Sequence, residues 1–260
     1  MNIALLQTNI IWEDIDSNLR RLHERLKTLR ETTEIVVLPE MFTTGFSMNC
    51  TDLAEEPDGR TIGLIREWAR EFKVALCGSF ICREHTHHYN RAFFITPHGQ
   101  CSYYNKRHLF RMGNETEVFT PGEEHTITEY NGWKICLMVC YDLRFPVWSR
   151  NTGNSYDLLI YVANWPASRR DAWDTLLKAR SIENMCYTCG VNRVGTDGNG
   201  LRYNGGTVAF SPKGARMAQA NDEEEQTVYL TLDKPELTEF RNRFPAWKDA
   251  DLFNLAKKEP

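Results

Sequence analysis

The sequence lacks the long apolar runs of a membrane protein, because no stretch approaches the roughly 20 apolar residues that span a bilayer. Its first residues, MNIALLQTNIIW, have neither the positively charged start nor the small-residue cleavage site of a signal peptide, and they are typical of a first strand. A strong excess of either charge is also missing. The net charge of −4 gives no reason to expect nucleic acid or an anionic membrane as a partner. We therefore expect a cytoplasmic enzyme or binding protein.

Internal repeats, low-complexity tracts and a Pro- or Ser-rich linker are absent as well, so the sequence predicts one continuous domain over residues 1–260. A chain of 260 residues is long enough to bury a substantial core. It contains eight cysteines, but without an export signal these indicate free thiols rather than a disulfide framework. The cysteines are Cys50, Cys77, Cys82, Cys101, Cys136, Cys140, Cys186 and Cys189.

Strand-like and helix-like patterns alternate along the chain, and two hairpin signatures lie in its middle. The predicted strands cover residues 2–8, 34–40, 74–80, 91–96, 100–105, 127–130, 133–140, 156–164, 186–192, 205–210 and 226–232. The predicted helices cover residues 17–31, 61–72, 171–185 and 235–244. Ser17 is the expected N-cap of the first helix, and the segment 235–260 is expected to be a helix followed by an extended tail. Early βαβ units with later hairpins imply mixed sheets whose faces are covered by helices. The predicted fold class is therefore an α/β layered sandwich.

Three of the predicted strands each deliver one reactive side chain at their carboxyl end. The strand IVVLP leads to Glu40, SYYN leads to Lys106, and LMV leads to Cys140. Ligands of α/β proteins tend to collect at this edge of the sheet. If the strands are neighbours, an acid, an amine and a thiol converge on one pocket.

This combination suits acyl transfer from a carbon–nitrogen bond. A free thiol has a pKa of ~8.5, so little of it is ionised at neutral pH. Glu40 can accept the proton of Cys140 as a general base, and the ammonium of Lys106 can stabilise an oxyanion on a substrate carbonyl. Simpler interpretations remain open at this point. Glu40 can end a turn after Pro39, Lys106 can be a solvated loop base, and Cys140 can be a core residue.

Two other motifs suggest a different class, a non-catalytic redox or metal-binding protein. Cys186 and Cys189 form a Cys-x-x-Cys motif, but its position inside a predicted strand favours core packing over a redox pair. His85, His87 and His88 cluster in the segment EHTHHYN, but no second group of ligands has zinc-binding spacing. A polar hairpin loop is the better interpretation of that segment.

The blocks LPEMF, NKRHLF and CYDLRFP, taken in this order, resemble the signatures of the nitrilase superfamily, the carbon–nitrogen hydrolases. The resemblance extends over nearly the whole chain. Within the superfamily the sequence is most similar to bacterial omega-amidases, which are also called 2-oxoglutaramate amidases. The stretches that point to this branch are KRHLFRM, VCYDLRFPVWSRN, YVANWPA and FPAWKDAD.

The resemblance implies a fold, a four-layer αββα sandwich of two mixed sheets that pairs with a second copy through its helices. It therefore implies a homodimer or a higher homo-oligomer. Residues 145–148 are expected to begin a helix, which would lie in this interface.

The resemblance also implies catalytic roles. Cys140 would be the nucleophile, Glu40 the general base and Lys106 the oxyanion stabiliser, with the backbone N–H of Tyr141 as a second oxyanion donor. A further family glutamate lies between the lysine and the cysteine, shortly before a Pro-Gly pair. Glu115 matches this position, while Glu117 is the second candidate and a solvated loop acid is the alternative for both.

Substrate-binding residues are expected next to the nucleophile. Asp142 and Arg144 are expected to pair with one another or with neighbouring loops and so to fix a sharp elbow. Arg144 is alternatively a ligand for a substrate carboxylate, because its planar fork suits that group. Asn164 and Trp165, at another strand end, are expected to line the pocket.

The implied reaction hydrolyses the terminal amide of a small omega-amido 2-oxo acid through a thioester, and it requires no metal or organic cofactor. Within the amidases, the rival substrates are deaminated glutathione and N-carbamoyl amines, which are bulkier.

Overall fold

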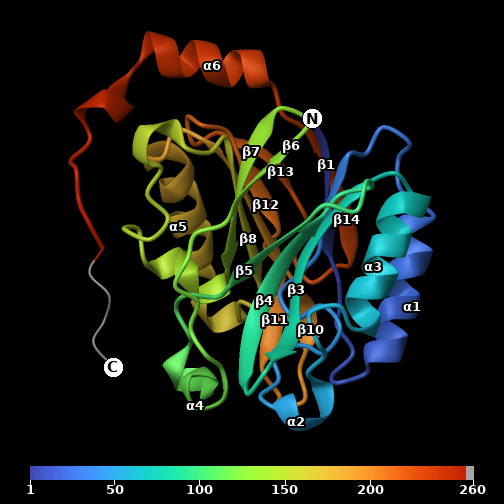
Figure 1. Cartoon of the computed structure of the whole chain (residues 1–260). Coiled ribbons are helices and arrows are strands. Elements are labelled where there is room, and N and C mark those ends of the chain that lie inside the picture. Colours follow the sequence, from blue (N-terminus) through green and yellow to red (C-terminus); the bar gives the residue numbers. More distant parts are fainter. Residues whose placement is uncertain (256–260) are drawn as a thin grey trace.

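Two six-stranded sheets pack face to face in the computed structural model, which describes residues 1–255 (Figure 1). The first sheet has the order β14-β1-β2-β3-β4-β5. Its strands are, in this order, Gln226–Thr231, Asn2–Gln7, Ile35–Val37, Ala75–Glu84, His87–Ile95 and Cys101–Asn105. The strands β1, β2 and β3 run parallel and the other neighbours pair antiparallel, so the sheet is mixed as predicted.

The second sheet has the order β13-β12-β9-β8-β7-β6. Its strands are, in this order, Arg216–Gln219, Val208–Phe210, Tyr187–Asn192, Leu158–Ala163, Trp133–Val139 and Ile127–Tyr130. Here β7, β8 and β9 run parallel, and the outer strands pair antiparallel. A separate ribbon joins β10 (Val194–Thr196) to β11 (Arg202–Asn204).

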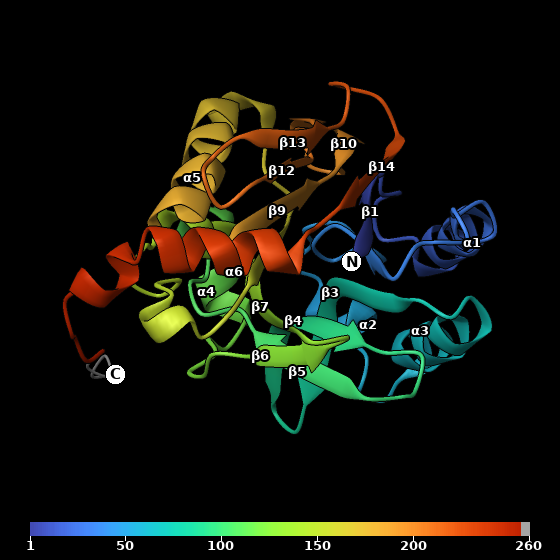
Figure 2. The ribbon, with the colours of Figure 1, turned by 90° about the horizontal axis from the view of Figure 1, so that it is seen from above.

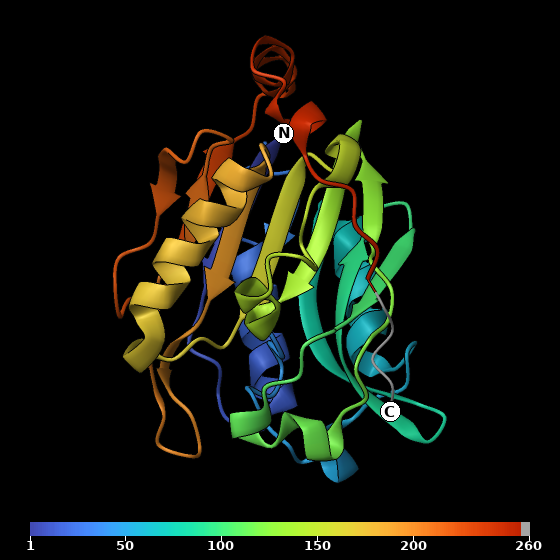
Figure 3. The same cartoon turned by 90° about the vertical axis from the view of Figure 1, so that its left-hand side faces the viewer.

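Helices cover the outer faces of both sheets. The helices α1 (Ile15–Leu26) and α3 (Arg60–Glu71) lie on the first sheet, and α5 (Arg170–Glu183) runs across the second (Figures 1 and 3). Successive side chains of a strand point to opposite faces, so each strand can serve two cores. Leu5 joins the buried cluster between the sheets, while Leu6 packs in the cluster under α1 and α3.

The first helix begins earlier than predicted. Its N-cap is Asp14, whose side chain accepts a hydrogen bond from the backbone N–H of Ser17 at 2.9 Å. The prediction of Ser17 as N-cap was therefore wrong, because a carboxylate three residues upstream satisfies the free N–H group of the first turn.

The connection from β7 to β8 contains no α-helix. The prediction of a helix that begins at residues 145–148 was therefore wrong. A 3₁₀ helix (Cys140–Arg144) is followed by turns instead. Phe145 precedes a proline and has a φ of −116° and a ψ of 87°, which lie outside the helical region and end the helical geometry. The indole N–H of Trp148 then donates to the hydroxyl of Tyr104 at 2.9 Å and holds the turn inward.

The final helix, α6 (Lys234–Arg243), lies across one end of the sandwich (Figures 1 and 2). The short helix α4 (Glu115–Val118) lies at the opposite end, together with α2 (Cys50–Leu53) (Figure 1). After α6 the chain forms a 3₁₀ helix (Ala246–Asp249), and residues 256–260 of the predicted tail lie outside the described part.

Among residues 1–255, no helix combines the length and apolarity needed to cross a membrane.

Candidate active site

The ends of β2, β5 and β7 bring three reactive side chains together. Glu40 lies beyond β2, Lys106 directly follows β5, and Cys140 directly follows β7. The Nζ atom of Lys106 lies 2.8 Å from Oε1 of Glu40, and both side chains are fully buried. Burial raises the pKa of the Cys140 thiol well above its usual value. The charge of Glu40 and a hydrogen bond to it raise this pKa further, while Lys106 opposes the rise.

These side chains lie at the base of a pocket of about 680 Å³. Cys140 and Lys106 line it directly, and Glu40 lies behind them without exposed surface. The other predicted residues at its wall are Tyr141, Arg144, Asn164 and Trp165. Phe46 and Phe110 narrow the pocket with aromatic surface.

Lys106 is held between two carboxylates. Its Nζ atom donates to Glu115 at 2.9 Å as well as to Glu40. Burial alone would lower the pKa of Lys106, but the charges of Glu115 and Glu40 outweigh burial and raise it. The pKa of Glu115 is itself raised by burial, which the charge of Lys106 partly offsets. Glu117, the second candidate, is exposed and lies outside this group.

A buried asparagine, which the sequence analysis did not single out, connects the two carboxylates. Nδ2 of Asn90 donates to Glu40 at 2.7 Å and to Glu115 at 3.1 Å. Its Oδ1 atom accepts a hydrogen bond from the hydroxyl of Ser79 at 3.0 Å, and that hydroxyl accepts one from the backbone N–H of Met41 at 2.8 Å. Both amide atoms of Asn90 are therefore used, so its orientation is fixed.

Cys140, the predicted nucleophile, has an unusual backbone conformation. Cys140 has a φ of +45°, and Met41, next to Glu40, has a φ of +44°. Side chains disfavour this left-handed region, and it persists only where the surroundings enforce it. At Cys140 the surroundings include Asp142, which accepts hydrogen bonds from the backbone N–H of Val139 at 3.0 Å and the hydroxyl of Tyr104 at 2.7 Å.

Asp142 also ties the elbow to the loop after Lys106. Its Oδ1 atom accepts a hydrogen bond from the backbone N–H of His108 at 2.9 Å. Of the two pairings expected for Asp142, the structure has the one with a neighbouring loop. Arg144 is exposed instead, and its guanidinium lies 5.2 Å from the ring of Trp165.

Asn164, directly after β8, holds Glu40 from the second sheet. Its backbone N–H donates to Oε2 of Glu40 at 2.8 Å, and its Nδ2 atom donates to the Glu40 carbonyl at 2.6 Å. Because a carbonyl can only accept, the side-chain amide has one orientation. Its Oδ1 atom is buried and has no hydrogen-bond partner within residues 1–255.

Comparisons with known proteins identify the family of this chain. The sequence model of the family described as carbon-nitrogen hydrolase matches residues 2–242. The chain belongs to the carbon–nitrogen hydrolase family. It is 41% identical to the omega-amidase YafV of Escherichia coli (strain K12) over 255 residues, which cover 98% of both chains. It is 31% identical to the 2-oxoglutaramate amidase of Bacillus subtilis (strain 168), over 95% of this chain and 96% of the relative.

A solved structure has the same fold. The protein XC1258 from Xanthomonas campestris superposes with a TM-score of 0.96 at 42% identity, covering 98% of this chain and 99% of that one. It is described as a CN-hydrolase superfamily protein with an arsenic adduct in the active site. These findings confirm the predicted family, the predicted α/β sandwich and the predicted class of enzyme, a hydrolase of carbon–nitrogen bonds.

The remaining motifs of this hydrolase lie away from the pocket. Cys186 and Cys189 are buried free thiols, and no disulfide joins any of the eight cysteines. His87 and His88 begin β4, with His85 in the turn before it. Within the described chain, no group of three His, Cys, Asp or Glu side chains is arranged to hold a metal ion.

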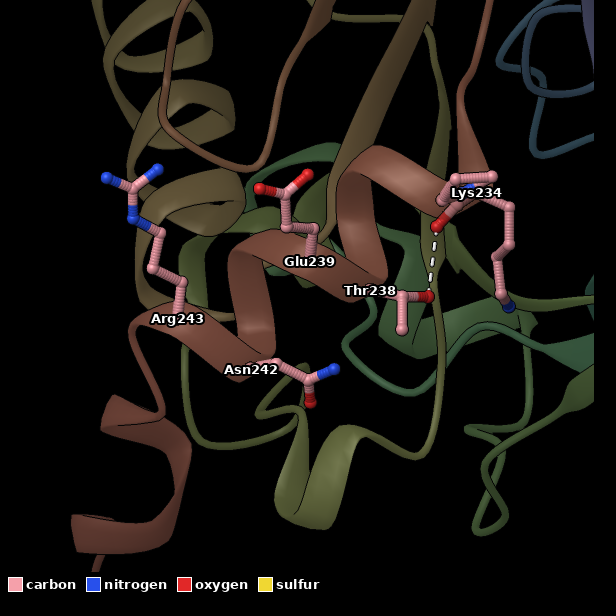
Figure 4. A pocket seen from close by; sticks show the side chains of 6 residues that line it. Lys234, Thr238, Glu239, Asn242 and Arg243 are labelled. Carbon is pink, nitrogen blue, oxygen red and sulfur yellow. Dashed lines mark hydrogen bonds between the residues drawn. The ribbon is translucent and has the colours of Figure 1, made fainter.

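A wide surface hollow of about 780 Å³ runs along α6 at the other end of the hydrolase (Figure 4). It is lined by Lys234, Pro235, Thr238, Glu239, Asn242 and Arg243. The hydroxyl of Thr238 donates to the Lys234 carbonyl at 3.0 Å, as in an ordinary helix. None of these residues is a cysteine, so the pocket at Cys140 remains the candidate active site.

Proposed function

We propose that this hydrolase is an omega-amidase. It converts a small omega-amido 2-oxo acid, such as 2-oxoglutaramate or 2-oxosuccinamate, into the dicarboxylate and ammonia. The observation that carries the proposal is the meeting of the Cys140 thiol, the Glu40 carboxylate and the Lys106 ammonium at the base of one pocket. The names of the relatives, omega-amidase and 2-oxoglutaramate amidase, support the substrate class.

In the first half-reaction, Glu40 takes the proton of Cys140 while the sulfur attacks the amide carbon. A base is needed because the raised pKa keeps the resting thiol neutral. The carbonyl π electrons move to oxygen, and the ammonium of Lys106 and the backbone N–H of Tyr141 stabilise the oxyanion. When the oxyanion collapses, the carbon–nitrogen bond breaks, the protonated Glu40 gives its proton to nitrogen, and ammonia leaves.

The second half-reaction hydrolyses the thioester. The Glu40 carboxylate, now free again, takes a proton from water, and the hydroxide attacks the thioester carbon. The carbon–sulfur bond breaks, the acid is released, and the proton on Glu40 returns to the sulfur of Cys140. Each turnover therefore restores the starting protonation of both groups.

The surrounding residues position these groups. Glu115 acts as the auxiliary acid, because it accepts a second hydrogen bond from the Lys106 ammonium beside the one accepted by Glu40. Asn164 takes part in substrate binding, since its unpartnered Oδ1 atom accepts a hydrogen bond from the amide nitrogen of the substrate. Trp165 and Arg144 form the wall at which the rest of the substrate lies.

The proposal extends to the state and place of the enzyme, which acts as a homodimer in the cytoplasm and without nucleic acid. Eight free thiols suit a reducing compartment. Ile182 on α5 and Phe244 after α6 are large apolar side chains that border the same groove, with 48% and 60% of their surface exposed. A second copy would cover them. Sedimentation analysis tests this point, since a monomer at micromolar concentration would contradict it.

The test of function is ammonia release from 2-oxoglutaramate, 2-oxosuccinamate, glutamine and an N-carbamoyl amine, measured side by side. We expect the two 2-oxo acids to be preferred and Cys140→Ala to abolish the activity. Cys186→Ala should retain it, whereas a redox role for the Cys-x-x-Cys motif predicts the reverse. Preference for glutamine or for the carbamoyl compound would overturn the proposed substrate class.

A further inference from the structure

One buried asparagine contacts all three charged residues of the site without reaching the pocket. Asn90, in β4, is fully buried and does not line the pocket at Cys140. Its Nδ2 atom carries two N–H groups and donates to Glu40 at 2.7 Å and to Glu115 at 3.1 Å. Its backbone carbonyl accepts a hydrogen bond from the backbone N–H of Lys106 at 3.0 Å. Asn90 is therefore placed to act on these groups rather than on a substrate.

The two oxygens of Glu40 are occupied to different extents. Oε1 accepts hydrogen bonds from Nζ of Lys106 at 2.8 Å and from Nδ2 of Asn90 at 2.7 Å. A carboxylate oxygen has two acceptor positions, so both positions of Oε1 are taken. Within residues 1–255, Oε2 accepts one hydrogen bond from a backbone N–H, that of Asn164 at 2.8 Å. The acceptor position that remains on Glu40 is therefore on Oε2.

The thiol lies beside the residue that holds Oε2. Sγ of Cys140 is 3.9 Å from the backbone carbonyl oxygen of Asn164, whose N–H binds Oε2 of Glu40. The thiol is also joined to the Glu40 carboxylate by a hydrogen bond. The open position on Oε2 is therefore the one that can take the proton of Cys140.

A serine on the neighbouring strand fixes the direction of the asparagine amide. Oδ1 of Asn90 accepts a hydrogen bond from the hydroxyl of Ser79 at 3.0 Å, and this hydroxyl accepts one from the backbone N–H of Met41 at 2.8 Å. Ser79 lies two residues before Ile81, the cross-strand neighbour of Asn90, so both side chains point to the same face of the sheet. A reversed amide would place Oδ1 against two carboxylates and lose the bond from Ser79.

We propose that Asn90 is a positioning residue of the reaction, which occupies Oε1 of Glu40 and so directs the thiol proton to Oε2. In the first step the S–H bond of Cys140 breaks and an O–H bond forms on Oε2, and this oxygen later gives the proton to the leaving nitrogen. Without the Asn90 donor, Oε1 regains an acceptor position and the carboxylate is held less firmly. This inference rests on the proposed function and deepens it, because it names the atom of the base that carries the proton.

The experiment measures kcat and KM for the amide that the wild type hydrolyses best in the side-by-side comparison. Asn90→Ala removes the donors. Asn90→Asp keeps the shape of the side chain but replaces the N–H groups by an acceptor, so it separates hydrogen bonding from the filling of space. Ser79→Ala leaves Asn90 in place and frees its amide to turn. The control is Ser102→Ala, which removes a hydroxyl that bonds Thr128 from β5, the next strand of the same sheet.

We expect Asn90→Ala to lower kcat by about 10- to 100-fold, the range for losing a hydrogen bond to a charged group. The KM should change far less, because Asn90 does not line the pocket. Asn90→Asp should lose at least as much of kcat in spite of its matching shape. Ser79→Ala should lose less, about 3- to 10-fold, because the two carboxylates still favour the N–H groups. Ser102→Ala should match the wild type.

Three results would overturn the inference. These are a wild-type kcat in both Asn90→Asp and Ser79→Ala, an effect on KM as large as that on kcat, and a higher kcat in Asn90→Asp than in Asn90→Ala. If Asn90→Ala does not fold, as judged by circular dichroism, Ser79→Ala and its control decide. Loss of activity in Cys140→Ala together with unaffected Asn90 variants leaves the amidase standing and rejects the inference. A preference for glutamine or the carbamoyl compound rejects the substrate class, and the Asn90 variants are then tested on that compound.

Discussion

The backbone N–H of Asn164 donates to Oε2 of Glu40 at 2.8 Å, although the two residues are 124 positions apart and come from different sheets. The second sheet, which supplies Cys140, thus also holds Glu40, the proposed base, which comes from the first sheet. The site is therefore complete only when the two sheets are packed against each other. A change that shifts one sheet against the other should therefore affect activity before it unfolds the protein.

Asn164→Ala should separate amide hydrolysis from ester hydrolysis. The variant loses the Oδ1 atom proposed to accept from the substrate nitrogen, and an ester of the same acid has no N–H to donate. We expect kcat/KM for the amide to fall by about 10-fold or more, the effect of one catalytic hydrogen bond, and the value for the ester to fall less. Stopped-flow and ammonia assays measure the two rates. Equal losses would mean that Asn164 only positions Glu40.

Glu115→Gln should move the alkaline limb of the pH–rate profile to lower pH. The pKa of Lys106 is raised by Glu115 and Glu40 against the effect of burial. Removing the charge of Glu115 leaves the lowering effect of burial less opposed, so the pKa of Lys106 falls. The ammonium then loses its proton at a lower pH, and its stabilisation of the oxyanion is lost there. The profile of kcat/KM is compared with that of Glu117→Gln, which alters an exposed acid and should match the wild type. An unchanged alkaline limb in Glu115→Gln would contradict this role.

The strand ends that carry the site could be predicted from the sequence, because apolar runs end at Glu40, Lys106 and Cys140 and local patterns report such boundaries. Their proximity could only be assumed, since it depends on how β2 to β5 pair in the first sheet and on how the second sheet packs against it. Asn90 was missed for a related reason. It stands at the end of the polar segment EHTHHYN, but β4 already begins at His87, and the register places Asn90 opposite Ile81 inside the sheet.

The conformation of the loop after Cys140 could not be predicted from the local sequence pattern either. The helix expected to begin at residues 145–148 does not form, although a Pro at residue 146 is compatible with the first turn of a helix. The observed turn is stabilised by the long-range contact of Trp148 with Tyr104. Arg169, which lines the pocket, shows the same limit, because it becomes a neighbour of Phe110 only through folding.

Alkylation of Cys140 should become faster throughout the range from pH 7 to pH 10. Burial and the charge of Glu40 raise the pKa of this thiol, so the thiolate fraction keeps growing with pH instead of levelling off near neutrality. Iodoacetamide labelling is followed by mass spectrometry of the peptide that contains Cys140. Glu40→Gln should speed labelling at pH 7, because it removes the negative charge that raises the pKa of the thiol and so increases the thiolate fraction. A rate that reaches its plateau below pH 7 would instead indicate a resting thiolate.

Arg241→Leu should destabilise the attachment of α6 without changing the pocket. The guanidinium of Arg241 donates to Asp157 at 2.9 Å and to the backbone carbonyls of Met185 and Tyr156, and it is buried. Removing one partner of a buried ion pair typically costs about 3–5 kcal/mol of unfolding free energy. Urea denaturation measures this loss. The matched control is Arg243→Leu, which changes an exposed arginine of the same helix (Figure 4) and should cost under about 0.5 kcal/mol. Because α6 lies at the end of the sandwich opposite α4, folded Arg241→Leu should keep its kcat, and a large loss of kcat would show that α6 supports the site.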